Sequence, residues 1–392
     1  MIKGIVRTAW YFMPRLSVLP LMLFISSCSL APWSSGPAIV DPTPLSGPIV
    51  WRHFSTNDDP IKTIAMEGDN LWMGTMKGII RYNTATGEYE IYTPKNTNGG
   101  FISRGVYIIA VDPSGKNKWV GTYGGGLSRY DGKTWQRYSP EDGLGDNWVY
   151  DIEFDRQGKM WVATWNGVSV FDGSRFKTYT PADGLADKWV YSISIDRDGI
   201  FWFGTEAGVS RFEEKANRWT TFTHKDGVGA EVGVVSDGSV YSPIPSSEKA
   251  YPEGESDHSS SFAEHHVKAG RQIQSSNPNF IISSLVDRAN DKWFGTWGAG
   301  IARFDGKVWT NFSDKEGLAG NYIFSLAMDR DGRIWAGTNG GTSWFDGTQW
   351  RTINDSSGLL NNNVLSVLFD RRGNRWFGTT KGLSVFKGPP PS

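Results

Sequence analysis

The chain has 392 residues, with 40 lysines and arginines against 41 aspartates and glutamates, so its formal net charge is −1. This balance excludes the basic surface expected of a nucleic-acid-binding protein, and a single cysteine excludes an intrachain disulfide framework. Aromatic residues make up 14% of the chain, and 19 tryptophans with 47 glycines are typical of many short strands joined by tight turns.

Residues 1–27 predict a lipoprotein signal peptide. The segment starts with basic residues and continues into an apolar run that is too short to span a bilayer. The run ends in the letters FISSC at residues 24–28, which resemble a bacterial lipobox and imply cleavage before Cys28 and lipidation of Cys28. An ordinary signal peptide with an incidental cysteine is the alternative. Ser29 after the cysteine, where no Asp stands, favours the outer membrane of a host that has one.

Residues 28–49 are rich in proline, serine and glycine and show no strand alternation. This composition predicts a tether that holds the following domain away from the lipid surface.

One four-residue pattern, Trp-x-Gly-Thr, organises the rest of the chain because it occurs seven times. Its copies begin at Trp72, Trp119, Trp161, Trp202, Trp293, Trp335 and Trp376, and Ala163 replaces the glycine in the third copy. Successive tryptophans lie 47, 42, 41, 91, 42 and 41 residues apart, so the long gap contains one repeat and an insertion of about fifty residues. A period near forty in β-rich units indicates a propeller.

Each unit is expected to form four antiparallel strands, which together make one propeller blade. In the third unit the alternation predicts strands over residues 149–154, 161–164, 167–171 and 176–180. Asp172-Gly173, between the third and fourth strands, is a two-residue hairpin signal.

The two ends of the repeat region predict how the ring closes. The last unit stops after residues 383–387 and lacks a fourth strand, whereas residues 50–55 precede every unit and match fourth strands elsewhere. Pairing of these two segments closes the ring and protects its sheet edges. The predicted fold is therefore an all-β, seven-bladed propeller over residues 50–388, with four antiparallel strands per blade and a tail at residues 389–392.

The units resemble the two-component regulator propeller repeats, whose pattern joins an Asp-x-x-Gly turn to Trp-x-Gly-Thr and a following Gly-Leu. The resemblance covers roughly residues 50–388 and implies a propeller fold and an extracytoplasmic recognition role. No kinase or receiver segment follows the repeats, so we do not expect the resemblance to carry phosphotransfer.

In a propeller, the loops after each Trp-x-Gly-Thr and the links between blades emerge on one face around the channel. Many of these positions are aromatic and differ between blades, which predicts a recognition surface of exposed rings. The predicted ligand-binding residues are Tyr123, Trp148, Trp165, Trp189, Glu206, Trp297, Tyr322 and Asn339. The alternative is that the rings plug the channel mouth and pack on each other. The repeating tryptophans themselves are expected in the core between blades.

First-strand positions in register predict a polar channel lining. These positions are Asp151, Ser192, Ser283, Ser325 and Ser366, with Thr63 in the first blade and Ile108 in the second. Small polar residues in this place are expected to surround water, and an ion near Asp151 is the alternative. The Asp-x-x-Gly turns are interpreted as capped turns rather than calcium loops, because they lack the longer ligand run and the terminal Glu.

The insertion, about residues 229–277, interrupts the link between the fourth and fifth blades on the ligand face. It contains His258, His265 and His266. A polar loop with solvated histidines is the expected structure, and a metal site or a pH-sensitive patch is the alternative.

No Gly-x-Ser-x-Gly, His-Glu-x-x-His or phosphate loop occurs, so we expect no catalytic residue, no metal and no cofactor. The sequence favours a monomeric, lipid-anchored sensing or binding propeller of the cell envelope. Its expected partner is an oligosaccharide, a peptide or an envelope protein. One alternative is a lyase or hydrolase, such as the seven-bladed lyases of virginiamycin B or of polysaccharides, using Glu206, Asp151 and an insertion histidine. The other alternative is an envelope assembly scaffold.

Overall fold

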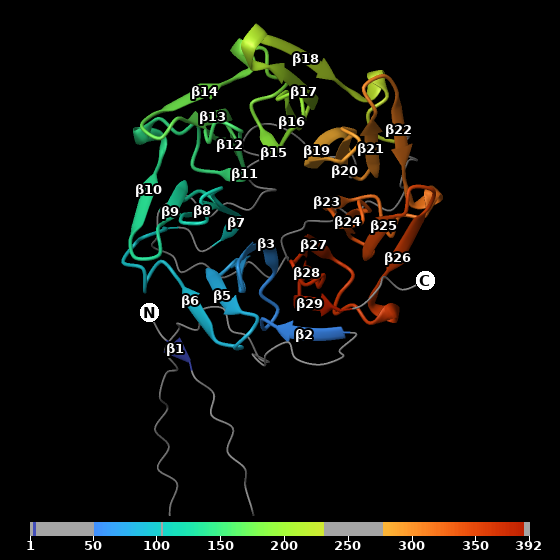
Figure 1. Cartoon of the computed structure of the whole chain (residues 1–392). Coiled ribbons are helices and arrows are strands. Elements are labelled where there is room, and N and C mark those ends of the chain that lie inside the picture. Colours follow the sequence, from blue (N-terminus) through green and yellow to red (C-terminus); the bar gives the residue numbers. More distant parts are fainter. Residues whose placement is uncertain (1–2, 5–50, 103–104, 231–276, 388–392) are drawn as a thin grey trace, which may run out of the picture.

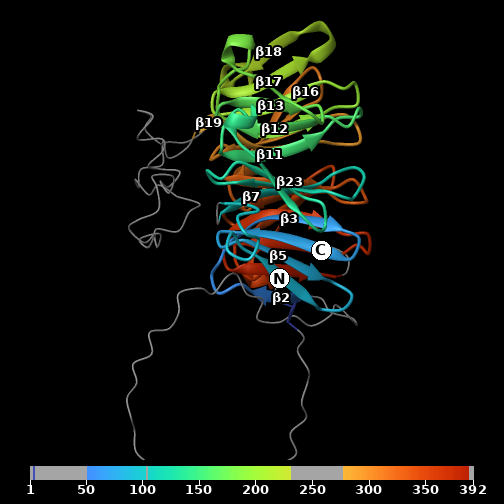
Figure 2. The same ribbon diagram turned by 90° about the vertical axis from the view of Figure 1, so that its left-hand side faces the viewer.

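The computed structural model describes residues 3–4, 51–102, 105–230 and 277–387. These residues form seven antiparallel sheets that are arranged radially around a central axis (Figure 1). Seen from the side, the ring is a disc whose strands run across its thickness (Figure 2). The prediction of an all-β, seven-bladed propeller with four strands per blade is confirmed.

In the first six blades the strands run in chain order from the axis to the rim, and in the seventh the outer strand is β2. The first three blades are β3 (Ile61–Glu67), β4 (Asn70–Thr75), β5 (Ile79–Asn83) and β6 (Tyr89–Tyr92); β7 (Val106–Val111), β8 (Lys118–Thr122), β9 (Leu127–Tyr130) and β10 (Trp135–Tyr138); and β11 (Val149–Phe154), β12 (Met160–Thr164), β13 (Gly167–Phe171) and β14 (Phe176–Tyr179). The next two are β15 (Val190–Ile195), β16 (Phe201–Thr205), β17 (Gly208–Glu213) and β18 (Arg218–Phe222); and β19 (Asn277–Val286), β20 (Lys292–Trp297), β21 (Ile301–Phe304) and β22 (Trp309–Phe312). The last two are β23 (Ile323–Met328), β24 (Ile334–Thr338), β25 (Thr342–Phe345) and β26 (Trp350–Ile353); and β27 (Val364–Phe369), β28 (Arg375–Thr379) and β29 (Gly382–Phe386) with β2 (Trp51–Ser55). The two-residue strand β1 (Lys3–Gly4) lies beside β6.

Closure of the ring follows the prediction. β2 is the outer strand of the seventh blade and pairs antiparallel with β29, with Trp51 opposite Phe386 and Ser55 opposite Gly382. Phe54 of β2 is buried against Tyr82 of the first blade, with 5.2 Å between the ring centroids. The seam between the two ends of the chain is therefore both hydrogen-bonded and packed.

The Asp-Gly turn between β13 and β14 differs from the predicted two-residue hairpin. The strands end at Phe171 and resume at Phe176, so four residues form the loop. The Asp172 carboxylate accepts the N–H groups of Ser174 and Arg175, and only Gly173 has a positive φ, of 101°. Side-chain capping by Asp172 stabilises a longer turn that needs only one left-handed residue.

The tryptophan of each repeat is buried between blades, and in five blades its indole is hydrogen-bonded to an aspartate of the preceding turn. In the third blade the Trp161 indole donates to Asp155 over 3.1 Å, and Asp155 also accepts the N–H groups of Gln157 and Lys159. The same indole-to-aspartate bond recurs at Trp202, Trp293, Trp335 and Trp376. These aspartates cap turns, as interpreted from the sequence, and their oxygens are already engaged.

The glycine and the threonine of the repeat have different roles. A Cβ on Gly295 would lie 2.2 Å from Ser283 Oγ and 2.6 Å from Ile323 Cγ2 of the next blade, so close packing at the axis requires glycine. The threonine hydroxyl donates to the carbonyl of the glycine that starts the third strand, for example from Thr164 to Gly167 over 2.8 Å. The equivalent threonine bond is present in all seven blades.

Short 3-10 turns lead the chain from the rim back toward the axis. They are η1 (Pro140–Asp142), η2 (Pro181–Asp183), η4 (His224–Asp226), η5 (Asp314–Glu316) and η6 (Asp355–Ser357), while η3 (Glu214–Ala216) precedes β18. Four of them carry a capping box, in which a Ser or Thr bonds an acidic residue three positions later. Each of these four turns ends at a glycine in the left-handed region.

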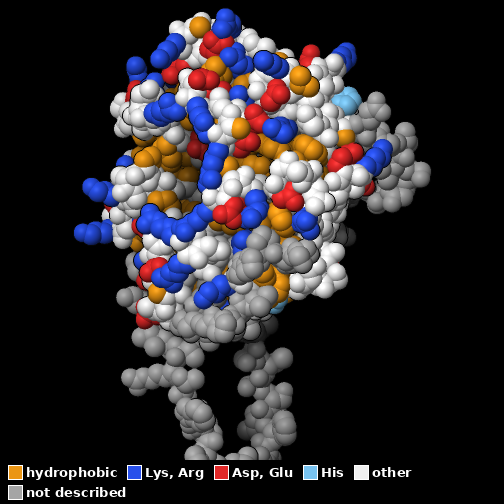
Figure 3. Space-filling view, turned by 45° about the vertical axis from the view of Figure 1, so that its right-hand side comes forward, with side chains coloured by type: hydrophobic (Ala, Val, Ile, Leu, Met, Phe, Trp, Pro, Cys, Tyr) orange, Lys and Arg blue, Asp and Glu red, His pale blue; other side chains and the backbone are white. Residues whose placement is uncertain are grey.

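Basic and acidic side chains are interspersed over the part of the surface in Figure 3, in keeping with the balanced charge of the sequence. Within the described residues, no helix is long and apolar enough to cross a membrane. The predicted lipidation site Cys28, the tether and the insertion histidines lie outside the described residues.

Candidate ligand-binding site

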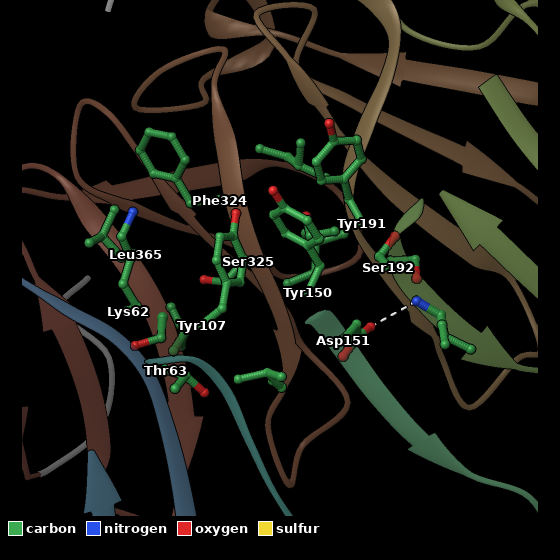
Figure 4. Close-up of a pocket in the computed structure, with 18 of the residues that line it drawn as sticks. Lys62, Thr63, Tyr107, Tyr150, Asp151, Tyr191, Ser192, Phe324, Ser325 and Leu365 are labelled. Atoms are coloured by element: carbon green, nitrogen blue, oxygen red, sulfur yellow. Dashed lines mark hydrogen bonds between the residues drawn. The ribbon is translucent and has the colours of Figure 1, made fainter. Parts of the chain in front are cut away.

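A cavity of about 290 Å³ lies on the axis of the ring and is lined by the inner strands of all seven blades (Figure 4). The structure places every predicted channel residue in its wall: Thr63, Ile108, Asp151, Ser192, Ser283, Ser325 and Ser366. The repeat register therefore locates one complete ring of lining residues.

A second ring of lining residues was missed from the sequence. Its members are Lys62, Tyr107, Tyr150, Tyr191, Ile282, Phe324 and Leu365, each one position before a predicted channel residue. Strict alternation would point these side chains away from the channel. The register of every inner strand shifts at this residue, for example between Val149 and Asp151, and such a bulge lets two successive side chains line the cavity.

Some polar channel residues bond the exposed edge of the next blade. Asp151 accepts the N–H of Ile193 over 2.8 Å, Thr63 accepts that of Ile109 over 3.4 Å, and the Ser283 hydroxyl donates to the carbonyl of Ile323 over 3.2 Å. Inner strands have an unpaired edge at the axis, and these bonds satisfy part of it. Among the described residues, the buried hydroxyls of Tyr150, Ser192, Ser325 and Ser366 have no hydrogen-bond partner. They remain available to water or to a ligand.

The cavity is not sevenfold symmetric, because aromatic rings gather on one side. Tyr107, Tyr150 and Tyr191 come from three consecutive blades, with ring centroids 4.4 Å and 4.8 Å apart in edge-on contacts. Tyr191 in turn contacts Phe280 at 4.6 Å, and Phe280 stacks on Trp297 at 5.6 Å. The blades thus share one frame and differ at the wall of the cavity.

The predicted mouth residues of the third and fourth blades form a stack. Trp148 and Trp165 lie 4.8 Å apart at an angle of 13°, and Trp189 follows at 5.4 Å from Trp165. The backbone N–H of Trp165 donates to the backbone carbonyl of Trp148, which joins the loop after the repeat motif to the link between blades. Trp148, Trp165 and Trp189 are 8%, 4% and 3% exposed, and their rings pack on one another, which is the alternative that the sequence left open.

The remaining predicted residues occupy different places. Tyr123 and Trp297 line the cavity itself, and Tyr322 lies against Trp297 with the rings at 89°. The Asn339 side chain accepts the N–H of Tyr322 over 3.3 Å and therefore supports the loop. Glu206 accepts a bond from Asn277 through its backbone carbonyl, at the point where the described chain resumes after residue 230.

Three charged side chains line the cavity: Lys62 on β3, and Asp151 and Glu153 on β11. Burial raises the pKa of Asp151, opposed by its bonds from the N–H groups of Ile193 and Ile152. The Glu153 side chain is exposed to the channel. Desolvation by the surrounding channel wall nevertheless raises the pKa of Glu153, and the neighbouring charge of Asp151 raises it further. The pair therefore retains a proton at a higher pH than isolated carboxyls do.

The described residues contain no group of three histidine, cysteine, aspartate or glutamate side chains that could hold a metal ion. Their arrangement supports binding through aromatic faces, hydroxyls and two carboxylates.

Comparison with known proteins agrees with this architecture. A family model described as "Two component regulator propeller" matches residues 143–166, 184–207 and 317–340, in the third, fourth and sixth repeats. The chain carries two-component regulator propeller repeats. No curated protein sequence matches it.

Similar solved structures share the fold at low identity. One is described as the extracellular domain of a hybrid two-component system from B. thetaiotaomicron, with a TM-score of 0.64 and 22% identity, covering 87% of this chain and 41% of that one. Virginiamycin B lyase from Staphylococcus aureus has a TM-score of 0.58 and 13% identity, with 86% and 98% covered. PorZ, a surface component of the type-IX secretion system of Porphyromonas gingivalis, has a TM-score of 0.58 and 15% identity, with 87% and 48% covered. The chain thus spans about two fifths of the extracellular domain that it resembles.

Proposed function

We propose that this chain is a non-catalytic ligand-binding propeller of the cell envelope, anchored by lipid on Cys28, whose ligand enters the axial cavity through its aromatic mouth. The ligand is a glycan, a peptide or a segment of a protein partner. The observation that supports this most is the broken symmetry of the cavity. The Trp-x-Gly-Thr frame is nearly constant in all seven blades, whereas the lining changes from Tyr150 and Tyr191 to Ile282 and Leu365.

The extracellular domain of the B. thetaiotaomicron system supports an extracytoplasmic sensing role by its shared fold and by the repeats. Sensing by this chain would require that it pass its ligand-bound state to a partner. The lyase resemblance supports the alternative of turnover at the same cavity, and the experiment below separates the two.

The test uses the full chain with Cys28→Ser, which removes the lipidation site. It is screened by thermal shift against oligosaccharides and peptides, with and without divalent ions, and hits are measured by calorimetry. We expect Trp297→Ala to weaken a stacked ligand by about 1–3 kcal/mol, because Trp297 presents its ring to the cavity.

Two further variants complete the design. Tyr123→Ala is a second test, because it removes a half-buried ring of the cavity wall. Trp309→Ala is the control, because it changes a tryptophan on an outer strand away from the cavity. Wild-type affinity in folded Trp297→Ala and Tyr123→Ala would contradict the site. Consumption of a bound ligand during incubation would assign the chain to the lyases instead.

Lipid anchoring is tested separately in cells grown with an alkyne-tagged fatty acid. The wild-type chain is expected to take up the tag and to fractionate with membranes, and Cys28→Ser is expected to lose both properties. An untagged, secreted wild-type chain would show an ordinary signal peptide.

A further inference from the structure

The third blade places negative charge on the channel where the other blades place none. At the first of two channel positions, Asp151 stands where four blades have serine, and at the second, Glu153 stands where the others have Ala, Ser or Leu. The same blade is the one in which Ala163 replaces the repeat glycine, and Ala163 is paired directly opposite Asp151. The departure is thus local to one blade and brings two carboxylates to one side of the cavity.

Neither carboxylate is neutralised by a described basic side chain. Asp151 accepts only backbone N–H groups, from Ile152 and Ile193. Glu153 forms no ion pair with any residue in the described ranges. Two like charges on neighbouring channel positions raise the free energy of the empty, ionised site, and a bound cation lowers it.

An independent feature of the same cavity also indicates a ligand. Tyr150, the residue before Asp151, lines the cavity and is 3% exposed, and its hydroxyl has no hydrogen-bond partner among the described residues. Figure 4 shows Tyr150, Tyr191 and Asp151 among the side chains that line this cavity. The faces of such rings attract organic cations, and their hydroxyls accept hydrogen bonds from ammonium groups.

We propose that the axial cavity selects a ligand bearing a protonated amine, which binds against Asp151 and Glu153 in the cavity that the Tyr150 ring and hydroxyl also line. This inference rests on the proposed function, since it takes the cavity as the ligand site. A divalent metal ion fits less well, because it takes six or more oxygen ligands and no cluster of three ligating side chains exists in the described part of the chain. Lys62 lines the cavity from the first blade, and its Nζ lies 5.9 Å from the centroid of the Tyr107 ring.

The pH dependence of binding follows from the titratable groups that line the cavity together with the pair. These are Lys62 and the tyrosines Tyr107, Tyr123, Tyr150 and Tyr191. Burial raises the pKa of Tyr107 and of Tyr150 above the usual value, so these two phenols stay neutral at and below pH 9. The two carboxyls carry the proton that an amine displaces, and amine binding is expected to release protons and to strengthen as pH rises from 5 to 8.

The experiment titrates the full chain, with Cys28→Ser, with amino sugars, amino acids and diamines, each paired with a neutral analogue. Glucosamine, for example, is compared with glucose and with N-acetylglucosamine. Calorimetry in buffers of different ionisation enthalpy counts the protons released. We expect amine-bearing members to bind, their neutral analogues to bind at least tenfold more weakly, and Glu153→Gln to weaken the amines at least tenfold and to remove proton release.

The control is Glu88→Gln, the same chemical change at an exposed residue between β5 and β6. Equal binding of neutral analogues, or unchanged amine binding in folded Glu153→Gln, would overturn the amine assignment while leaving the cavity as the ligand site. Calcium or magnesium binding that Glu153→Gln abolishes would replace the amine by a metal. A panel in which no member binds would overturn both this inference and the proposed site.

Discussion

The seam that joins the two ends of the chain gives the most direct test of the packing. Phe54 lies on β2, is 1% exposed, and packs in one cluster with Ile61 and Tyr82 of the first blade and Leu383 of the seventh. Replacing Phe54 by alanine keeps the backbone pairing of β2 with β29 and removes the ring that fills the seam.

The expected loss of stability follows from the burial of this ring. Truncation of a fully buried phenylalanine to alanine costs about 3–5 kcal/mol, and its contact with Tyr82 at 5.2 Å adds to the packing that is lost. A loss of about 4 kcal/mol is a large fraction of the about 5–15 kcal/mol by which typical domains are stable. We therefore expect Phe54→Ala to lower the urea midpoint strongly while the unfolding transition stays single.

Urea unfolding of the full chain, followed by tryptophan fluorescence and circular dichroism, measures this loss. Phe222→Ala is the matched control, because Phe222 occupies the equivalent place on β18 and is only half-buried, so its loss is expected to be smaller. A Phe54→Ala chain within about 1 kcal/mol of wild type would refute the reasoning that the seam is a packed part of the core.

Three further predictions concern the repeat frame and the channel. Trp161→Phe removes the indole bond to the buried Asp155 carboxylate and is expected to cost about 1–3 kcal/mol in urea unfolding, so an unchanged midpoint would contradict the bond. Gly295→Ala places a methyl group against Ser283 and is expected to lower the free energy of unfolding by about 1–3 kcal/mol. Adding Ser283→Ala is expected to restore part of this loss, and an equal loss in the single and double variants would contradict the clash. The pKa of Glu153 is higher in the folded chain than in the unfolded chain, so the folded chain holds this proton more tightly. The resulting stabilisation is complete below the unfolded pKa and is lost as pH rises through the folded pKa. Glu153→Gln should therefore flatten the fall in melting temperature between pH 5 and 9, and parallel curves for the two chains would contradict the shift.

Most of the fold was predictable because seven copies of the Trp-x-Gly-Thr repeat fix the strand positions in every blade. Strand boundaries predicted for the third blade differ from the observed ones by at most one residue, as at Met160 and Tyr179. The closing pair of strands was predictable because the last unit lacks a fourth strand, whereas residues 50–55 match a fourth strand and precede every unit. The loop at Asp172 was not, since a capping carboxylate substitutes for the left-handed backbone that a two-residue hairpin requires.

The candidate site was only half predictable. Ser192 and its equivalents were located from register alone, whereas Tyr150 and Tyr191 were missed because a bulge breaks the alternation that sequence reasoning assumes. Burial of Trp165 was not predictable either, because it depends on where rings from neighbouring loops meet in space.

The pairing of β2 with β29 also has a consequence for the order in which the molecule is made. Among the propeller strands, the ribosome synthesises residues 51–55 before all those of the blades and residues 382–386 after all the others. These two segments are nevertheless neighbours in the final sheet. The first segment has to wait, unpaired, until nearly the whole domain has emerged, so nascent chains that stop early carry an open seam at both ends. Truncated translation products are therefore expected to be recognised by chaperones and proteases, because the ring closes only after residues 382–386 have emerged.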